Sequence, residues 1–217
     1  MIRLYICGTD TDVGKTFVVR LLANAFRARE QSVTVVKLVQ TGVGEHEAGD
    51  AHTAVEQTGQ TAIELVRFRK PADPWSAAIA EGRPALTAAD LAKDVEKITG
   101  NVLVEGSGGA LVPLNAEETL STTAEICGLS AVVVVGLRLG CISHALLTQY
   151  YLAERNVRTR GFVLVDRWET GAEYAQEIET VLLSRGSVLG TVPYCGKGDP
   201  SPATGESLLR AISESHK

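Results

Sequence analysis

The sequence is poor in cysteine, the residue that cross-links small secreted proteins and binds structural metals. It has four cysteines in 217 residues, Cys7, Cys127, Cys141 and Cys195, and no two of them form a Cys-x-x-Cys pair. Their wide spacing indicates neither a zinc site nor a redox dithiol. We therefore expect reduced thiols, most of them buried.

Long apolar runs and concentrated positive charge are also missing. The longest apolar run, Ala131–Val135 extended by Gly136 and Leu137, is far shorter than the ~20 residues of a membrane-spanning helix. The N-terminus has no basic segment followed by a cleavable apolar one. The net charge is −5, the isoelectric point is about 5.5, and no lysine and arginine cluster offers the basic face that nucleic acids require. We expect a cytoplasmic protein without membrane or nucleic-acid partners.

What the sequence does contain is a series of short apolar runs, most of them separated by helix-length segments. Such continuous runs are typical of strands in a sheet covered on both faces, and alternation with helices makes the sheet mainly parallel. With 45% hydrophobic residues and no linker, the pattern predicts one doubly wound α/β domain over residues 1–217. The expected strands are Leu4–Cys7, Val33–Val39, Ile63–Phe68, Val102–Val104, Ala131–Val135, Phe162–Val165 and Val188–Val192.

The segment Gly8–Thr16 reads Gly-Thr-Asp-Thr-Asp-Val-Gly-Lys-Thr and leads into a helix-like segment, Phe17–Arg29. Strand, loop, Gly-Lys-Thr and helix in this order are typical of a phosphate-binding loop. In such loops backbone N–H groups surround phosphate oxygens, the lysine contacts the terminal phosphates and the hydroxyl binds Mg²⁺. The loop is a variant, because Thr9 stands where the strict pattern has glycine. The alternative interpretation is an ordinary helix start with an exposed lysine.

Two charged residues follow the first strand and helix. Lys37 is expected at the end of a buried strand, before Gln40-Thr41-Gly42. It is either a strand-end lysine that reaches solvent or a second cation facing the same crevice as Lys15. The second interpretation suits a reaction that builds negative charge on a transferred phosphoryl group. Asp50 begins a helical segment; we expect it to cap that helix, with Mg²⁺ binding as the alternative.

Glu105 ends a buried strand and precedes Gly106-Ser107-Gly108-Gly109. A strand ending in an acid is the arrangement in which phosphate-loop enzymes hold Mg²⁺, and the glycines allow close approach to phosphate. A tight turn with a surface glutamate is the alternative.

Upstream, the proline-rich segment Arg69–Arg83 predicts an irregular loop, either a cover for a site or an ordinary connection.

A last motif, Leu139-Gly140-Cys141-Ile142-Ser143-His144, opens a helix expected to continue through Ala153. The backbone N–H groups at this helix start could bind a carboxylate. We assign His144 no catalytic role.

Taken together, these motifs resemble the dethiobiotin synthetase family in order and spacing along nearly the whole chain. The resemblance rests on Gly8–Thr16, on Lys37 with Gln40-Thr41-Gly42, on Val104–Gly109 and on Leu139–His144. It implies an ATP-dependent ring closure in biotin synthesis, in which 7,8-diaminopelargonate, CO₂ and ATP give dethiobiotin, ADP and phosphate. The implied intermediates are a carbamate and a carbamic–phosphoric anhydride. The resemblance also implies Mg²⁺ and a homodimer with shared active sites.

The same resemblance implies roles for individual residues. Lys15 would hold the phosphates, Lys37 would lie between carbamate and γ-phosphate, and Thr11 and Thr41 would hydrogen-bond the diamine or carbamate. Mg²⁺ would lie near Thr16, Asp50 and Glu105. The substrate's distal carboxylate would bind, in the other subunit's site, to Gly140, Cys141, Ile142 and Ser143. The nucleotide would be bound by Asp12, Val13, Gly14, Lys15, Thr16, Phe17, Asp50, Glu105, Gly106, Ser107, Gly108, Gly109, Val165, Asp166, Pro193 and Tyr194.

The chain departs from the family at the segment expected to read adenine. Well-known members have an Asn-Asp pair there, whereas this chain has Val165-Asp166, followed by Arg167 and Trp168. The amide that would discriminate adenine is absent, and Tyr194 could stack on any base. We therefore expect the enzyme to use ATP but to tolerate CTP, GTP and other triphosphates.

Two other protein classes share a phosphate loop. ATPase switches that position proteins in cells carry a lysine five residues before the loop lysine, where this chain has Asp10, and often end in a basic amphipathic helix. Here the last segment, Glu206–Lys217, is short and weakly basic. Amide-forming ligases that take ammonia from a glutaminase domain need more residues than this chain has. The synthetase is the favoured interpretation.

Overall fold

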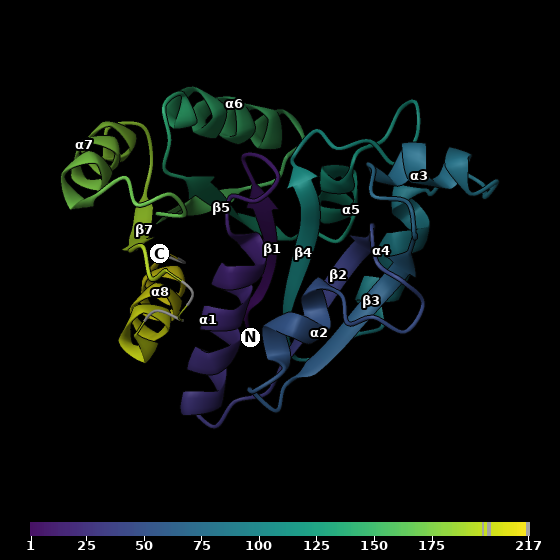
Figure 1. Cartoon of the computed structure of the whole chain (residues 1–217), viewed down its shortest axis with the longest axis horizontal. Coiled ribbons are helices and arrows are strands. Elements are labelled where there is room, and N and C mark those ends of the chain that lie inside the picture. Colours follow the sequence, from purple (N-terminus) through teal and green to yellow (C-terminus); the bar gives the residue numbers. More distant parts are fainter. Residues whose placement is uncertain (197, 199–200, 216–217) are drawn as a thin grey trace.

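A single parallel sheet forms the middle of the protein. The structure is a computed structural model that describes residues 1–196, 198 and 201–215. Seven strands lie in the order β3-β2-β4-β1-β5-β6-β7, and all neighbouring pairs are parallel (Figure 1). The strands are β1 Arg3–Gly8, β2 Val33–Gln40, β3 Thr61–Arg67, β4 Asn101–Gly109, β5 Ser130–Gly136, β6 Thr159–Val165 and β7 Val188–Val192. The predicted α/β class with a mainly parallel sheet is confirmed.

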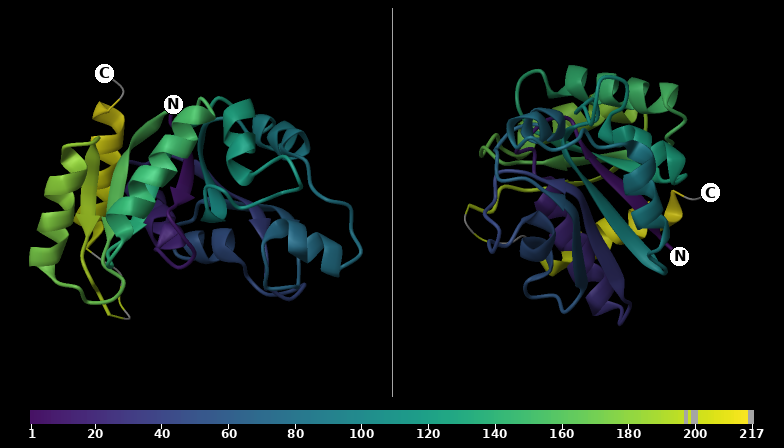
Figure 2. Two further views of the ribbon diagram at one scale, coloured as in Figure 1. Left: turned by 90° about the horizontal axis from the view of Figure 1, so that it is seen from above. Right: turned by 90° about the vertical axis from the view of Figure 1, so that its right-hand side faces the viewer.

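Helices cover both faces of this sheet, which explains why its strands are apolar without interruption (Figure 2). One face carries α1 Lys15–Ala28, α2 Asp50–Val55 and α8 Pro202–Glu214. The other face carries α3 Pro74–Ala80, α4 Ala88–Glu96, α5 Leu120–Ile126, α6 Cys141–Glu154 and α7 Ala172–Leu183. No helix among the described residues is long and apolar enough to cross a membrane.

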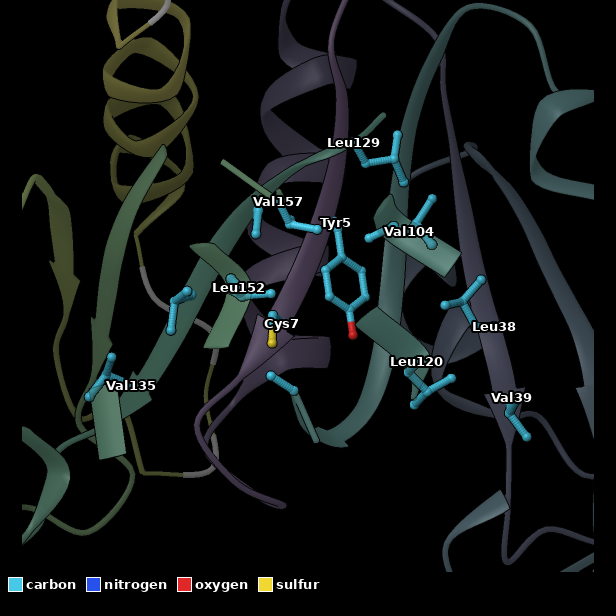
Figure 3. Packing of buried hydrophobic residues seen from close by; sticks show 14 of the residues in the cluster. Tyr5, Cys7, Leu38, Val39, Val104, Leu120, Leu129, Val135, Leu152 and Val157 are labelled. Carbon is cyan, nitrogen blue, oxygen red and sulfur yellow. The ribbon is translucent and has the colours of Figure 1, made fainter. Parts of the chain in front are cut away.

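Alternate side chains of β1 enter two separate apolar cores. Leu4 and Ile6 pack on the side of α1, and Tyr5 and Cys7 pack on the side of α5 and α6. Figure 3 shows Tyr5 among the aliphatic side chains of the second core. Because all four side chains are at most 2% exposed, the strand that leads into the phosphate loop is fixed from both faces.

Three expectations about where elements begin and end are wrong. The segment Arg69–Arg83 is not wholly irregular, since it contains α3; Asp73 caps that helix by accepting a hydrogen bond from Ser76 N–H, and Pro74 occupies its first turn. Proline there starts a helix instead of preventing one. Glu105 does not end its strand, because β4 continues to Gly109. Likewise Lys37 lies within β2, three residues before its end.

Arg3 joins β1 to the end of α4, the helix that precedes β4. Its guanidinium donates to the carbonyls of Ile98 (2.5 Å) and Val95 (3.1 Å). A cation at the carbonyl end of a helix is stabilised by the unpaired carbonyls and by the helix dipole. Arg3 therefore helps to set β4, which carries Glu105, beside β1.

We predict that Arg3→Ala lowers the free energy of unfolding by about 1–3 kcal/mol, because hydrogen bonds from a charged donor are lost. The matched control is Lys97→Ala, which removes an exposed cation near the same helix end that pairs with Asp94 and should change stability by less than about 0.5 kcal/mol. Urea unfolding of both variants measures the difference. Equal effects would show that Arg3 is an ordinary surface cation.

Candidate functional site

The phosphate loop has the geometry that its sequence predicts. Lys15, the first residue of α1, turns back over the loop, and its Nζ donates to the carbonyl of Asp10 (2.8 Å). A Cβ on Gly8 would lie 2.8 Å from Lys15 Nζ and 2.9 Å from the carbonyl oxygen of Gly108. The variant loop therefore uses Gly8, not the residue at position 9, for the close approach. No side chain among the described residues accepts a hydrogen bond from the first N–H groups of α1, so these groups are available to an anion.

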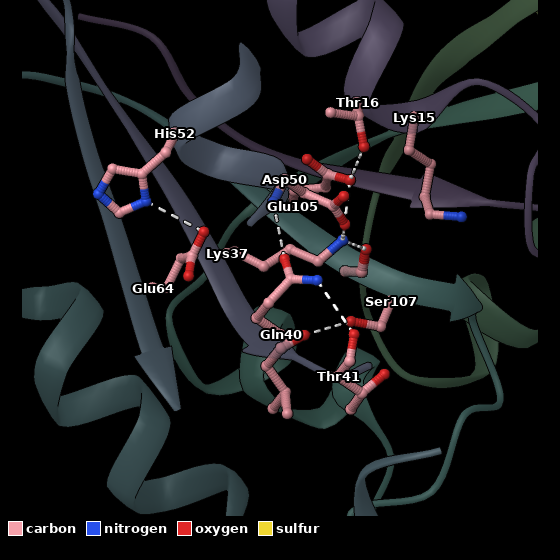
Figure 4. A network of polar contacts seen from close by, with 12 residues as sticks. Lys15, Thr16, Lys37, Gln40, Thr41, Asp50, His52, Glu64, Glu105 and Ser107 are labelled. Carbon is pink, nitrogen blue, oxygen red and sulfur yellow. Dashed lines mark hydrogen bonds and ion pairs between the residues drawn. The ribbon is translucent and has the colours of Figure 1, made fainter. Parts of the chain in front are cut away.

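Beside this loop, four side chains from four elements meet (Figure 4). Lys37 Nζ of β2 lies 2.9 Å from Glu105 Oε1 of β4 and 2.5 Å from Asp50 Oδ2 of α2. Thr16 Oγ1 of α1 donates to the same Glu105 Oε1 (2.8 Å). The side chain of Lys37 is 3% exposed and that of Glu105 is 0% exposed. These contacts exclude both the solvent-reaching lysine and the surface glutamate.

The two lysines have different electrostatic surroundings. Burial acts to lower the pKa of Lys37, but the charges of Glu105 and Asp50 outweigh it and raise that pKa above its ordinary value. Burial and the charge of Lys37 together lower the pKa of Lys15 below its ordinary value. Lys15 is thus the cation that would gain most from a bound phosphate.

The cluster also offers ligands suited to Mg²⁺. Glu105 Oε2 is buried and has no hydrogen-bond partner among the described residues. Asp50 and the Thr16 hydroxyl add further oxygen ligands beside it. The described part of the chain holds no group of three or more His, Cys, Asp or Glu placed to bind a metal. Mg²⁺ takes few protein carboxylates and keeps several waters, so this donor set fits it.

A cavity of about 620 Å³ joins the loop and the cluster. On its far side lie Pro71, Ala72, Asp73 and Pro74, so the start of α3 borders the cavity. Val13, Gly106 and Gly109 do not line it. The predicted site residues that do are Thr11, Asp12, Gly14, Lys15, Thr16, Phe17, Lys37, Thr41, Asp50, Glu105, Ser107 and Gly108.

Of the residues predicted to lie near the base, Asp166, Pro193 and Tyr194 line a smaller cavity of about 140 Å³ together with Phe17 and Arg167. Val165 is buried and does not line it. The carboxylate of Asp166 accepts hydrogen bonds from the N–H groups of Trp168 (3.1 Å), Thr170 (3.0 Å) and Gly171 (3.2 Å). Burial raises its pKa, but these bonds outweigh burial and lower it. Asp166 therefore holds its own loop in shape.

The segment Gly140–Ser143 lines neither cavity. It begins α6, whose N-cap residue, Gly140, has no side chain to cap the helix. Just before it, Arg138 pairs with Asp10 of the phosphate loop. The segment's role in a partner's site stays a prediction.

Sequence reasoning missed Gln40 and misplaced the role of Asp50. Gly49, not Asp50, is the N-cap of α2. Gln40 Oε1 accepts a hydrogen bond from Asp50 N–H (2.8 Å), which fixes the first turn of α2 and leaves the Asp50 carboxylate for Lys37. A polar residue ending a buried strand was the available signal. Arg167, which lines both cavities, carries no motif that would have revealed it.

Comparison with known structures identifies the fold. The chain is similar to the cell division ATPase MinD of Pyrococcus furiosus, with a TM-score of 0.62, 16% identity and 99% coverage of each chain. It is also similar to a putative plasmid partition protein of Borrelia burgdorferi, with a TM-score of 0.65, 10% identity and 98% coverage of each chain. Identities this low show the fold alone.

Sequence comparison identifies the family. A family model described as an AAA domain matches residues 2–200. Proteins named ATP-dependent dethiobiotin synthetase BioD match from Streptomyces coelicolor (36% identical, 92% of this chain and 87% of the relative) and Corynebacterium efficiens (36%, 96% of each). A third, from Aquifex aeolicus, is 36% identical over 88% of this chain and 87% of the relative. With these relatives spanning nearly its whole length, the chain belongs to the ATP-dependent dethiobiotin synthetase family.

Proposed function

We propose that the cavity beside the phosphate loop closes the ureido ring of dethiobiotin from 7,8-diaminopelargonate, CO₂ and ATP. The observation that supports this most is the placement of Lys37, a buried cation held by Glu105 and Asp50 next to the phosphate loop. A ligase that activates its substrate by phosphorylation needs positive charge at that point. The chain is accordingly an ATP-dependent ligase of biotin biosynthesis.

The reaction has three steps. One amine of the diamine attacks CO₂, loses a proton and becomes a carbamate. A carbamate oxygen then attacks the γ-phosphorus, and the bond to ADP breaks. Finally the second amine attacks the carbamate carbon, phosphate leaves, a proton is lost and the ring closes. Each step moves negative charge through the space between Lys15 and Lys37, so preorganised cations lower the barriers.

Side chains that line the cavity supply binding and orientation. Thr11, Thr41, Ser107 and Gly108 line the cavity. Thr11 and Thr41 would hydrogen-bond the diamine or carbamate, and Ser107 and Gly108 would contact the phosphates. Thr16, Asp50 and Glu105 would hold Mg²⁺, which would neutralise charge on the phosphate oxygens. The ATPase switches share only the fold, and no observation at the site favours their function.

The first test is direct. Pure protein incubated with 7,8-diaminopelargonate, bicarbonate, Mg²⁺ and ATP should yield dethiobiotin, detected by mass spectrometry, with one ADP per ring closed. Phosphate release that is equally fast without the diamine would contradict the proposal and favour an ATPase switch.

Replacing either site lysine tests its catalytic role. We expect Lys37→Ala and Lys15→Ala each to reduce kcat by on the order of 10²–10³-fold, the usual cost of removing one preorganised charge stabiliser. Lys93→Ala, which removes an exposed lysine of α4, is the matched control and should keep wild-type turnover. Near-normal turnover of Lys37→Ala at saturating substrates would reduce Lys37 to a structural ion-pair partner.

The base of the nucleotide should matter little. Val165 replaces the amide that would read adenine, and a bidentate base contact gives roughly 1–3 kcal/mol of discrimination. We expect kcat/KM for ATP, CTP, GTP and UTP to differ by less than about a hundredfold under equal Mg²⁺. A preference for ATP above about a thousandfold would show that other groups select adenine.

Dimer formation is expected to complete the site. Leu139, Leu147 and Tyr150 are 95%, 62% and 67% exposed and lie in or beside α6 near Gly140–Ser143, which supports an interface there. Leu147→Glu should weaken the dimer and lower activity in parallel, measured by sedimentation and by activity against protein concentration. A fully active monomer would contradict the proposal that the active site is shared between two subunits.

A further inference from the structure

Arg167 occupies an unexplained position between the two cavities of the site. It follows β6, and it lines both the 620 Å³ cavity with Lys15 and Thr16 and the 140 Å³ cavity with Phe17 and Tyr194. The first cavity contains the phosphate loop, and the second contains the aromatic side chain on which a base could stack. Arg167 therefore lies where a nucleotide would pass from its phosphates to its base.

The backbone of the phosphate loop makes room for this arginine. Gly14 has φ = 99°, and a Cβ added to it would lie 3.0 Å from Val165 Cγ1 and 3.5 Å from Arg167 Cδ. The stem of Arg167 thus crosses the N-terminus of α1 at van der Waals distance. A guanidinium at this point adds positive charge to N–H groups that already favour an anion.

The guanidinium of Arg167 has no partner of opposite charge within the described part of the chain. Its guanidinium forms no hydrogen bond or ion pair there, whereas Lys37 is held by two carboxylates and Arg138 by Asp10. An arginine that lines a binding cavity without a partner is suited to a phosphate oxygen, because its N–H groups match phosphate geometry.

We propose that Arg167 binds the α-phosphate of the nucleotide and contributes equally for every base. The inference rests on the proposed nucleotide site. A nucleotide bound there would have its terminal phosphates near Lys15 and the Glu105 cluster, which would leave the phosphate nearest the base for Arg167. A phosphate contact of this kind carries no information about the base.

The test is titration calorimetry of the whole protein with Mg²⁺ and ATP, ADP or AMP. Arg167→Gln should raise Kd by about 10–100-fold, the value of a charged hydrogen bond, and by the same factor for all three nucleotides. It should do so equally for ATP, CTP, GTP and UTP. Arg167→Lys, which keeps the charge, should recover part of the loss. Arg185→Gln, at an exposed arginine after α7, is the matched control and should bind as wild type does.

Each other result contradicts the proposal in a distinct way. An unchanged Kd in Arg167→Gln, with wild type binding normally, overturns this inference and leaves the proposed function intact. Weaker binding of ATP alone would place Arg167 at the γ-phosphate, and losses that differ more than tenfold among the four bases would place it at the base edge. If wild type binds no nucleotide, both the proposed function and this inference fail.

Discussion

The site depends on one buried ion pair whose position is set by strand register. Lys37 of β2 is paired with Glu105 of β4 in the parallel ladder, so the two side chains emerge side by side on the face that α1 and α2 cover. Because Thr16 lies in the first turn of α1 and Asp50 begins α2, the contacts of the ion pair bring the N-termini of both helices together. Removing one partner of a buried pair leaves an uncompensated charge, which costs far more than the pair's net contribution.

That arrangement gives the two lysines of the site different surroundings. Lys37 is oriented by the same carboxylates that are suited to a metal, so metal and lysine would be held on neighbouring oxygens. Lys15 instead donates a hydrogen bond to the backbone carbonyl of Asp10, which is a weaker partner than a carboxylate. Lys37 is therefore held in ion pairs with carboxylates, whereas Lys15 is available to bind phosphate.

The sequence predicted the fold from its apolar runs because the five inner strands are mostly buried on both faces. It located Lys15, Thr16 and Glu105 because strand–loop–helix order constrains where such residues emerge. It failed where local interactions outweigh the sequence pattern. Asp73-Pro74 starts a helix within a proline-rich segment, and the Gln40 side chain accepts a hydrogen bond from the first N–H group of α2. The position of Arg167 in the site could not be predicted from the sequence, because it depends on how the β6–α7 loop lies over Gly14.

The central place of β1 has a consequence for synthesis on the ribosome. β1 pairs only with β4 and β5, although β2 and β3 come between them in the chain. The nascent phosphate loop is therefore complete in sequence long before its supporting strand has a neighbour. Until β4 emerges, Glu105 is absent and β1 remains an unpaired apolar strand, the kind of segment that aggregates or engages chaperones. The full set of site side chains, Lys15, Lys37 and Glu105, is present only after that point.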